Sequence, residues 1–279
     1  MISTSDMHLN YQFRITHVEA LEIIKSSVRR ARNYCEDVEW SAMDSTRSNI
    51  DFLIRAVEIA ITAGASTINF PDTVGYITPA EYSFLIKTIK NKVQNIDKAI
   101  ISTHCHNDLG LAVANTLAAV TAGARQVECT INGIGERAGN AAMEEIVMAI
   151  RTRCDQFPFK INIDPTQFAA ISKLVSSASG FAVQKNKAIV GANAFSHASG
   201  IHQDGMLKHR LLYEIITPES VGFKKFELVM GKHTGRAAFL NKLQSLNIHI
   251  ETDNFERLFQ KFKQLSDSQK KLPMKTLLH

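Results

Sequence analysis

The chain has 279 residues, 45% hydrophobic and 21% charged, a composition that can bury a large core and excludes a disordered or fibrous chain. Its net charge of +5 comes from scattered lysines and arginines. Because a nucleic-acid surface needs a denser basic stripe with interleaved aromatic residues, no nucleic-acid partner is expected. No apolar run is long enough to span a membrane. Four single cysteines, without a CxxC pair or secretory leader, favour a reducing cytoplasm.

Strand and helix patterns alternate along the first 154 residues. Residues 1–6 read as the end of a strand and its loop, and a helical pattern follows at 16–34. Further strands are predicted at 37–41, 66–70, 98–103 and 126–131, and helices at 50–63, 79–93, 109–122 and 141–153. Strands separated by single helices indicate βαβ units and a parallel sheet. Glycines close two of the helices directly before a strand, at Gly64 and Gly123. Without a GxGxxG phosphate loop, these repeats favour an α/β barrel over a doubly wound sheet.

A His-x-His pair, His104 and His106, follows the apolar run 98–103. Residues two apart on a strand point to the same side, so both imidazoles can reach one metal ion. Zinc, manganese or iron would accept such nitrogens. Alone, the pair is also compatible with two polar residues at a strand end. The helical pattern that follows places it at a strand-to-helix junction, where parallel barrels carry their catalytic groups.

Five segments carry a resemblance to a known family. They are NFPDTVGY at 69–76, IISTHCHNDLGL at 100–111, NGIGERAGN at 132–140, KAIVGANAFSHASGIHQDG at 187–205 and YEIITPESVG at 213–222. From Ile2 to about Leu265, the chain resembles the 2-isopropylmalate synthases, in the group that includes homocitrate synthase, citramalate synthase and 3-hydroxy-3-methylglutaryl-CoA lyase. The SGIHQDG and TPESVG segments point to the synthase branch rather than to the lyases.

The resemblance implies a partial TIM (β/α)₈ barrel in the α/β class. About four and a half βα units fit before residue 154, whereas a whole barrel has eight units in roughly 250 residues. Residues 1–154 are therefore expected to form the C-terminal half of the catalytic barrel, with its first three to four βα units missing. Residues 155–279 are expected to form mostly helical linker subdomains, without the regulatory domain of the family.

The implied activity is the Claisen condensation of acetyl-CoA with a 2-oxo acid, 3-methyl-2-oxobutanoate, in leucine biosynthesis. A divalent metal (Mn²⁺, Mg²⁺ or Zn²⁺) would be held by His104 and His106, with Asn140 as a further ligand or neighbour. His202 matches the histidine proposed as the base, supplied by the partner subunit of a homodimer. Thr73 matches a threonine that hydrogen-bonds the keto acid's carboxylate.

Two residues of the NGIGERAGN segment keep two interpretations open. Glu136 and Arg137 either bind substrate or form a structural ion pair at the barrel mouth. The glycines of this segment, Gly133, Gly135 and Gly139, indicate a tight loop that approaches the ion.

The chain also departs from the family pattern. It contains no DxTLRDGxQ-like motif, whose aspartate is the third metal ligand in relatives. In the family's Ser-x-Glu-Asp segment, at 41–44, Met43 stands where relatives have a glutamate implicated in catalysis, and a thioether cannot take up a proton. Two alternatives to the synthase follow. One is a catalytically inactive remnant of that enzyme, and the other is a homocitrate or citramalate synthase, which differs only in the keto acid accepted.

Overall fold

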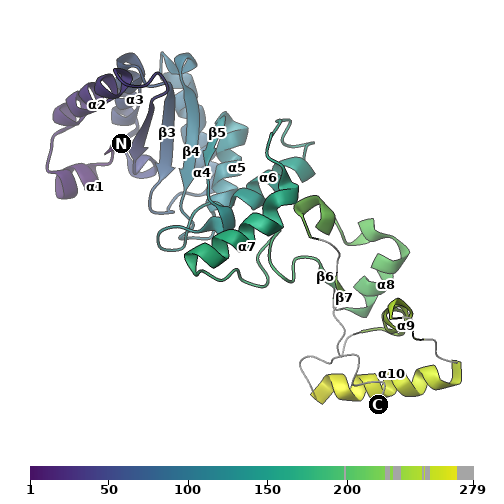
Figure 1. Cartoon of the computed structure of the whole chain (residues 1–279). Coiled ribbons are helices and arrows are strands. Elements are labelled where there is room, and N and C mark those ends of the chain that lie inside the picture. The colour runs from purple at the N-terminus through teal and green to yellow at the C-terminus, as the bar shows by residue number, and fades with distance from the viewer. Residues whose placement is uncertain (198, 224–226, 229–233, 247, 249–251, 269–279) are drawn as a thin grey trace. The chain divides into compact units, whose positions relative to one another are not determined.

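The computed structural model describes residues 1–197, 199–223, 227–228, 234–246, 248 and 252–268. Contacts within the chain divide it into two compact units, Met1–Asn162 and Ile163–His279. The sheet that carries the histidine pair belongs to the first unit (Figure 1).

The first unit is built on a five-stranded parallel sheet in the order β1-β2-β3-β4-β5. Its strands are β1 (Ile2–Ser3), β2 (Glu39–Met43), β3 (Thr67–Asp72), β4 (Ile100–Cys105) and β5 (Gln126–Glu128). Its helices are α1 (Asp6–His8), α2 (His17–Arg32), α3 (Ile50–Ala63), α4 (Pro79–Lys92), α5 (Ala112–Ala122) and α6 (Met143–Thr152). Consecutive strands are neighbours, and right-handed crossovers then place the connecting helices on one face of the sheet.

The sheet is curved like the wall of a barrel. Gln126 on β5 donates a hydrogen bond to Glu39 on β2. In a flat sheet, three strand spacings would hold these strands about 14 Å apart. Only strong curvature brings their side chains into contact across the inner face, as in a barrel wall. The predicted partial TIM barrel is thereby confirmed.

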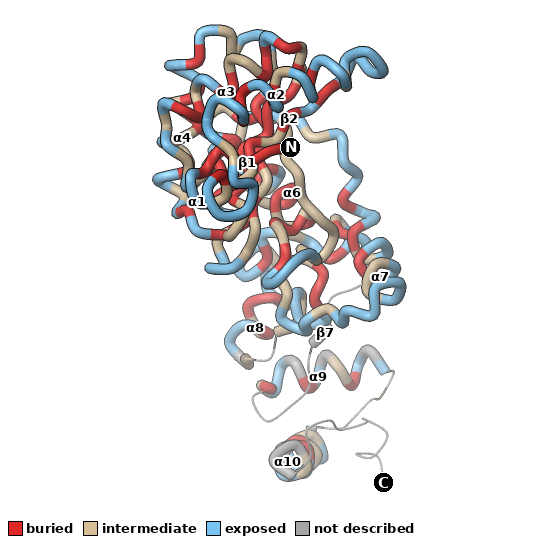
Figure 2. The backbone as a smooth tube through the Cα atoms, turned by 90° about the vertical axis from the view of Figure 1, so that its left-hand side faces the viewer, coloured by how far each residue is buried: buried red, intermediate tan, exposed pale blue. Residues whose placement is uncertain are grey.

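The core of this unit lies around β3, which is buried at all six positions. β1, near the N-terminus in Figure 2, is buried at both. A strand covered on both faces is typical of a parallel sheet. The largest fully buried side chains of the unit include Tyr82, Phe70, Leu53, Ile68 and Ile86.

Local sequence signals set the helix ends. α2 begins with a capping box between Thr16 and Glu19, which satisfies backbone N–H groups at the helix start. The predicted glycine closures of α3 and α5 are confirmed, since Gly64 and Gly123 have φ of 114° and 135°. Such values suit glycine because it has no Cβ.

Two predicted strands are shifted by two residues in the structure. β2 covers Glu39–Met43 instead of 37–41, and β4 covers Ile100–Cys105 instead of 98–103. A short 3₁₀ turn, Ile96–Lys98, occupies the predicted start of β4. The prediction for α5 also began too early, because Asn107 Oδ1 accepts the N–H of Ala112 at 3.1 Å and residues 107–110 form a turn. His104 therefore lies within β4 rather than after it.

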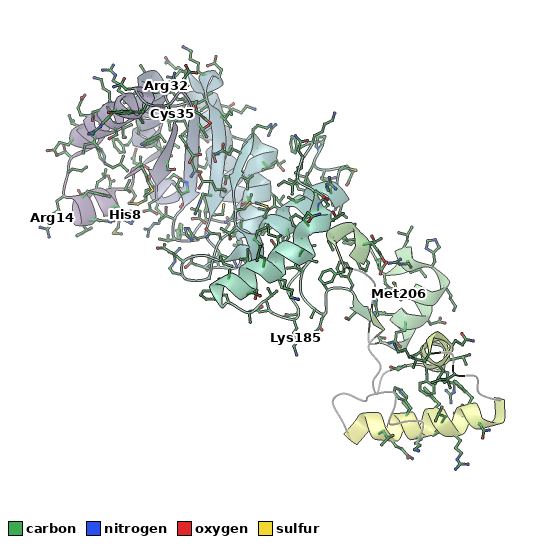
Figure 3. The ribbon with its side chains drawn as sticks, in the orientation of Figure 1. His8, Arg14, Arg32, Cys35, Lys185 and Met206 are labelled. Atoms are coloured by element: carbon green, nitrogen blue, oxygen red, sulfur yellow. The ribbon has the colours of Figure 1, made fainter. Side chains whose placement is uncertain are left out.

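The segment after β1 packs back onto the end of β2. His8, labelled on α1 in Figure 3, has its Nε2 3.9 Å from Asp44 Oδ2. Asp44 is fully buried and pairs with Arg47, whose Nε lies 2.9 Å from its Oδ1. The buried carboxylate therefore has a guanidinium partner within hydrogen-bond distance, as a buried charged group requires.

The second unit is mostly helical in its described part. It contains α7 (Phe168–Ser179), α8 (Gly200–Lys208), α9 (Arg236–Ser245) and α10 (Thr252–Ser268), with a parallel pair formed by β6 (Ser196–His197) and β7 (Glu227–Leu228). Met206, labelled in Figure 3, is buried on α8. A small cluster of Phe239, Leu243, Phe259 and Phe262 joins α9 to α10. None of the helices in the described ranges of the chain has the length and apolar composition needed to cross a membrane.

Candidate metal centre

The candidate site lies where β3, β4 and β5 reach their carboxyl ends. Parallel strands present these ends at one edge of the sheet, which is the catalytic face of α/β barrels. β4 brings His104 and, one residue beyond its end, His106 to this edge. Asn140 lies opposite His106 in an isolated antiparallel bridge. The structure thus brings together all three residues predicted to hold the metal.

The two imidazoles converge on one point. His104 Nε2 and His106 Nε2 are 3.2 Å apart, and their rings are tilted by 53°. Two nitrogens bound to one ion at about 2.1 Å lie about 3.0 Å apart at a right angle and about 3.4 Å apart at the tetrahedral angle. The observed separation falls between these values, so the pair is arranged as a chelate.

The charge state of His106 suits metal binding. Burial lowers the pKa of His106, and the neighbouring His104 and Arg137 lower it further. A metal ligand must be a neutral imidazole with a free lone pair. The lowered pKa keeps His106 neutral near neutral pH.

The side-chain oxygen of Asn140 is available as a metal ligand. Its Nδ2 donates to the carbonyl of Ile134 at 3.1 Å. Its Oδ1 is buried and has no hydrogen-bond partner among the described residues. An unpaired buried acceptor costs free energy unless something occupies it. An amide oxygen is a suitable metal ligand, so the orphaned Oδ1, on the residue bridged to His106, fits a divalent cation.

Glycines allow the loop to wrap tightly around Asn140. A Cβ on Gly135 would lie 2.0 Å from Asn140 Nδ2, and a Cβ on Gly139 would lie 2.0 Å from the carbonyl oxygen of Gly133. Gly139 also has a φ of 93°, which disfavours other residues. The tight loop expected from the sequence is present.

Glu128 is a further residue of the site that sequence reasoning missed. Its Oε2 lies 2.6 Å from His104 Nδ1. The bond with His104 lowers the pKa of Glu128, so the carboxylate is ionised and can only accept the Nδ1–H. The sequence carries only a partial signal, because it places Gln126 and Glu128 two apart on the strand that follows the histidine strand; the register that pairs Glu128 with His104 is seen only in the structure.

A layer of polar side chains crosses the inner face next to the histidines. Asn69 on β3 donates to Ser41 Oγ at 3.2 Å and to Glu128 Oε1 at 3.0 Å. Gln126 donates to Ser102 Oγ at 3.1 Å as well as to Glu39. Burial and the neighbouring Glu128 raise the pKa of Glu39 to about 7. β2, β3, β4 and β5 are therefore linked through side chains as well as through the sheet.

Arg137 ties three loops together at the edge of the site. Its Nε and Nη2 donate to the carboxylate of Asp108 at 2.7 and 3.0 Å, and Nη2 also donates to the carbonyl of Thr73 at 2.8 Å. Glu136 is more distant, at 3.6 Å, and its side chain is 82% exposed. The main partner of Arg137 is thus Asp108, which the sequence analysis did not consider. This geometry favours a structural ion pair, with the guanidinium bridging the loops after β3, β4 and β5.

Thr73 follows the end of β3 and contacts the residue after Met43, which ends β2. Thr73 Oγ1 accepts the backbone N–H of Asp44 at 2.8 Å, which leaves its hydroxyl hydrogen to donate elsewhere. Met43, the last residue of β2, is half-buried and carries no titratable group. An apolar side chain therefore occupies the position at which the family resemblance predicts a glutamate.

His202 belongs to the second unit, on α8, where it is exposed. Its ring centroid lies 4.4 Å from that of Tyr213 and 6.5 Å from that of His197. These contacts define the surroundings of His202 within its own unit, and its action on the metal centre stays a prediction.

The donor set at the centre consists of two imidazoles and one amide oxygen. Across the residues that the structure describes, no group of three or more His, Cys, Asp or Glu side chains could hold a metal ion. The residues present thus fit part of a coordination sphere, with open positions for water or substrate.

Comparison with known proteins identifies the family. Residues 1–175 match the HMGL-like family model, and residues 189–270 match the homocitrate synthase post-HMGL domain-like model. The chain is 61% identical over 269 residues to 2-isopropylmalate synthase of Methylorubrum populi, covering 96% of this chain and 52% of that protein. It is 60% identical to the enzyme of the same name from Nitrobacter winogradskyi, with the same coverage. The chain thus spans about half the length of the curated relatives it matches, and the resemblance to 2-isopropylmalate synthases is confirmed.

Solved structures agree on the fold. A hydroxymethylglutaryl-CoA lyase from Pseudomonas aeruginosa matches with a TM-score of 0.55 at 16% identity, covering 65% of this chain and 62% of that one. The corresponding lyase from Brucella melitensis matches with a TM-score of 0.52 at 16% identity, covering 64% of each chain. The family model covers well over half of the residues and includes the whole unit that holds the histidine pair. The chain belongs to the HMGL-like family.

Proposed function

We propose that the metal centre serves a 2-isopropylmalate synthase-type condensation of acetyl-CoA with 3-methyl-2-oxobutanoate in leucine biosynthesis. The observation that carries the proposal is the convergence of His104 Nε2 and His106 Nε2 beside the unpartnered Oδ1 of Asn140. The name shared by the curated relatives, 2-isopropylmalate synthase, supports the product.

The residues of the centre would hold Mn²⁺, Mg²⁺ or Zn²⁺ through two nitrogens and one oxygen. When bound, such an ion supplies a Lewis acid for the keto oxygen of the 2-oxo acid. Thr73, whose Oγ1 already accepts one N–H, would donate its hydroxyl hydrogen to the carboxylate of that acid. The bridge from Arg137 to Asp108 would hold the surrounding loops in place, so that the substrate meets a preorganised site.

The reaction also needs a base to take a methyl proton from acetyl-CoA. We assign this role to His202, acting on the barrel of a partner subunit in a homodimer, on the strength of the SGIHQDG segment. An imidazole is suited to accept a proton near neutral pH. The resulting enolate would attack the keto carbon, and hydrolysis of the thioester would then release CoA. All four cysteines are free, which supports a cytoplasmic location.

Met43 favours a second candidate, a metal-binding but catalytically inactive chain. It replaces the carboxylate of relatives with a thioether at the end of β2, so no proton can be taken up there.

Metal binding and turnover should be measured separately. Calorimetric titration with Mn²⁺ is expected to show one site that His106→Ala weakens strongly. CoA release from acetyl-CoA, followed with a thiol reagent, is expected to depend on 3-methyl-2-oxobutanoate and on the metal. Greater turnover with 2-oxoglutarate or pyruvate would indicate homocitrate or citramalate synthesis. Metal binding without CoA release would support the inactive candidate, and a wild-type chain that binds no metal would refute the proposed site.

A further inference from the structure

The two histidines of the metal centre are supported unequally. His104 Nδ1 lies 2.6 Å from Glu128 Oε2, whereas His106 Nδ1 is buried without a hydrogen-bond partner among the described residues. A hydrogen bond at the far nitrogen decides which tautomer an imidazole adopts and which way its ring faces. Only His104 therefore has a hydrogen bond at Nδ1 that fixes the orientation of its ring and the direction of its metal-facing Nε2.

The carboxylate that supports His104 is itself held. Asn69 is 2% exposed, and it uses its Nδ2 to donate to Glu128 Oε1 and to Ser41 Oγ. Glu128 therefore accepts from Asn69 at Oε1 and from His104 at Oε2. The carboxyl of Glu39 on β2 also hydrogen-bonds Glu128, so the carboxylate is held from β2 and β3 as well as by the histidine.

The bond leaves His104 ready for a metal. Because a carboxylate oxygen accepts, the hydrogen of this bond resides on His104 Nδ1, and the ring offers its lone pair at Nε2. That lone pair faces His106 Nε2 at 3.2 Å, the side from which both rings would bind one ion.

We propose that Glu128, held by Asn69, is a positioning residue that fixes the tautomer and orientation of His104 and thereby sets the metal affinity of the centre. The inference rests on the proposed metal site and extends it to two residues that would not touch the ion. His104 is then the preorganised ligand, and His106 is the one that adjusts.

The test is the dissociation constant for Mn²⁺ of the full chain, measured by calorimetry. Loss of such a supporting partner typically weakens metal binding about 10- to 100-fold. Glu128→Ala is expected near the upper end of that range, because both the acceptor and its charge are lost. Glu128→Gln and Asn69→Ala are expected near the lower end, because the first keeps a neutral acceptor and the second keeps the bond to His104. Glu22→Gln, on the α2 surface with a 70% exposed side chain, serves as the control and should not change the affinity.

A second readout separates positioning from a merely structural role. Long-range ¹H–¹⁵N spectra of the imidazoles should show His104 as the Nδ1–H tautomer in the wild type and a mixture in Glu128→Ala. A structural role alone would lower the melting temperature while leaving the tautomer and the Mn²⁺ affinity unchanged, and that result would overturn the inference. If Glu128→Ala fails to fold, the Mn²⁺ affinity and the His104 tautomer of the near-isosteric Glu128→Gln test the inference instead.

The outcomes also distinguish this inference from the proposed function. A wild-type chain that binds no Mn²⁺, or an affinity unchanged by His104→Ala, would overturn the metal site and the inference together. If His104→Ala weakens binding but neither Glu128 variant does, the metal site stands and the positioning role is refuted.

Discussion

Gly139 offers a stringent test of how the loop holds Asn140 in place. Gly139 is buried and has a φ of 93°, and a Cβ there would lie 2.0 Å from the carbonyl oxygen of Gly133. Gly110 is a matched control, because its φ is 73° but a Cβ there would meet nothing within 4 Å. Alanine at each position carries the same kind of backbone cost, and only Gly139→Ala adds a steric clash.

The magnitudes can be worked out from the contacts. A left-handed conformation costs an L-residue roughly 1–2 kcal/mol, which is the whole expected effect of Gly110→Ala. Relief of the clash at Gly139 must shift backbone, and the bonds at risk are Gly139 N–H to Glu136 O at 2.8 Å and Asn107 N–H to Gly139 O at 2.9 Å. At about 1 kcal/mol for each bond, Gly139→Ala should lower the free energy of unfolding by about 3–4 kcal/mol.

The assay is urea unfolding followed by fluorescence. Trp40 is the single tryptophan and is 2% exposed on β2, so its emission reports on the first unit. Because Asn140 follows Gly139 directly, the Mn²⁺ affinity of Gly139→Ala should also fall by about tenfold. If Gly139→Ala were no more destabilising than Gly110→Ala, the loop would not be sterically constrained and the reasoning would be refuted.

Three further predictions concern other parts of the molecule. The pKa of Glu39 is raised from 4.5 to about 7, so the folded state retains a proton that the unfolded state has lost, and stability should fall as pH rises through that interval. Glu39→Gln should remove this slope in urea titrations at several pH values, and an unchanged slope would contradict the assignment. Arg137→Lys cannot make the two-pronged bond to Asp108 and should cost about 1 kcal/mol, the upper end for a partly exposed pair; equal urea midpoints would show that the bridge is dispensable. Phe239→Ala removes a fully buried ring stacked on Phe262, a loss of about 3–5 kcal/mol, and should speed hydrogen exchange in α10 while leaving β3 unchanged. Unaltered exchange in α10 would argue against a shared core.

Much of the first unit could be predicted from local signals. Hydrophobic period, the glycine closures at Gly64 and Gly123 and the spacing of the βα repeats were enough to predict a parallel sheet. The first and last residues of each strand were predicted less well. They depend on which residues of the neighbouring strand are in place to pair with them. β2 pairs from Glu39 onward with Thr67 of β3, and no property of residues 37–38 alone encodes that register.

The site, like the fold, has features that local sequence signals predict and features that depend on contacts between distant segments. His104 and His106 were predicted to face one ion because a strand alternates its side chains; their Nε2 atoms lie 3.2 Å apart, and the binding of an ion stays a prediction. Asn69 and Glu128 escaped notice because their bond joins residues 59 apart in sequence. It depends on the curvature of the sheet, which a strand-by-strand reading does not supply. Arg137 pairs with Asp108 rather than with Glu136 because the loops after β4 and β5 lie next to each other, which the sequence alone does not show.

The polar layer of the sheet has a consequence for how the chain folds. Gln126 reaches Glu39 across a sequence separation of 87 residues, and Asn69 reaches Glu128 across 59. Contacts between distant segments form late, because closing long loops costs entropy that only the last contacts offset. A nascent chain without β5 would have both histidines but no Glu128 behind His104. High-affinity metal uptake should therefore mark the completion of this unit's folding, and bound metal would in turn slow its unfolding.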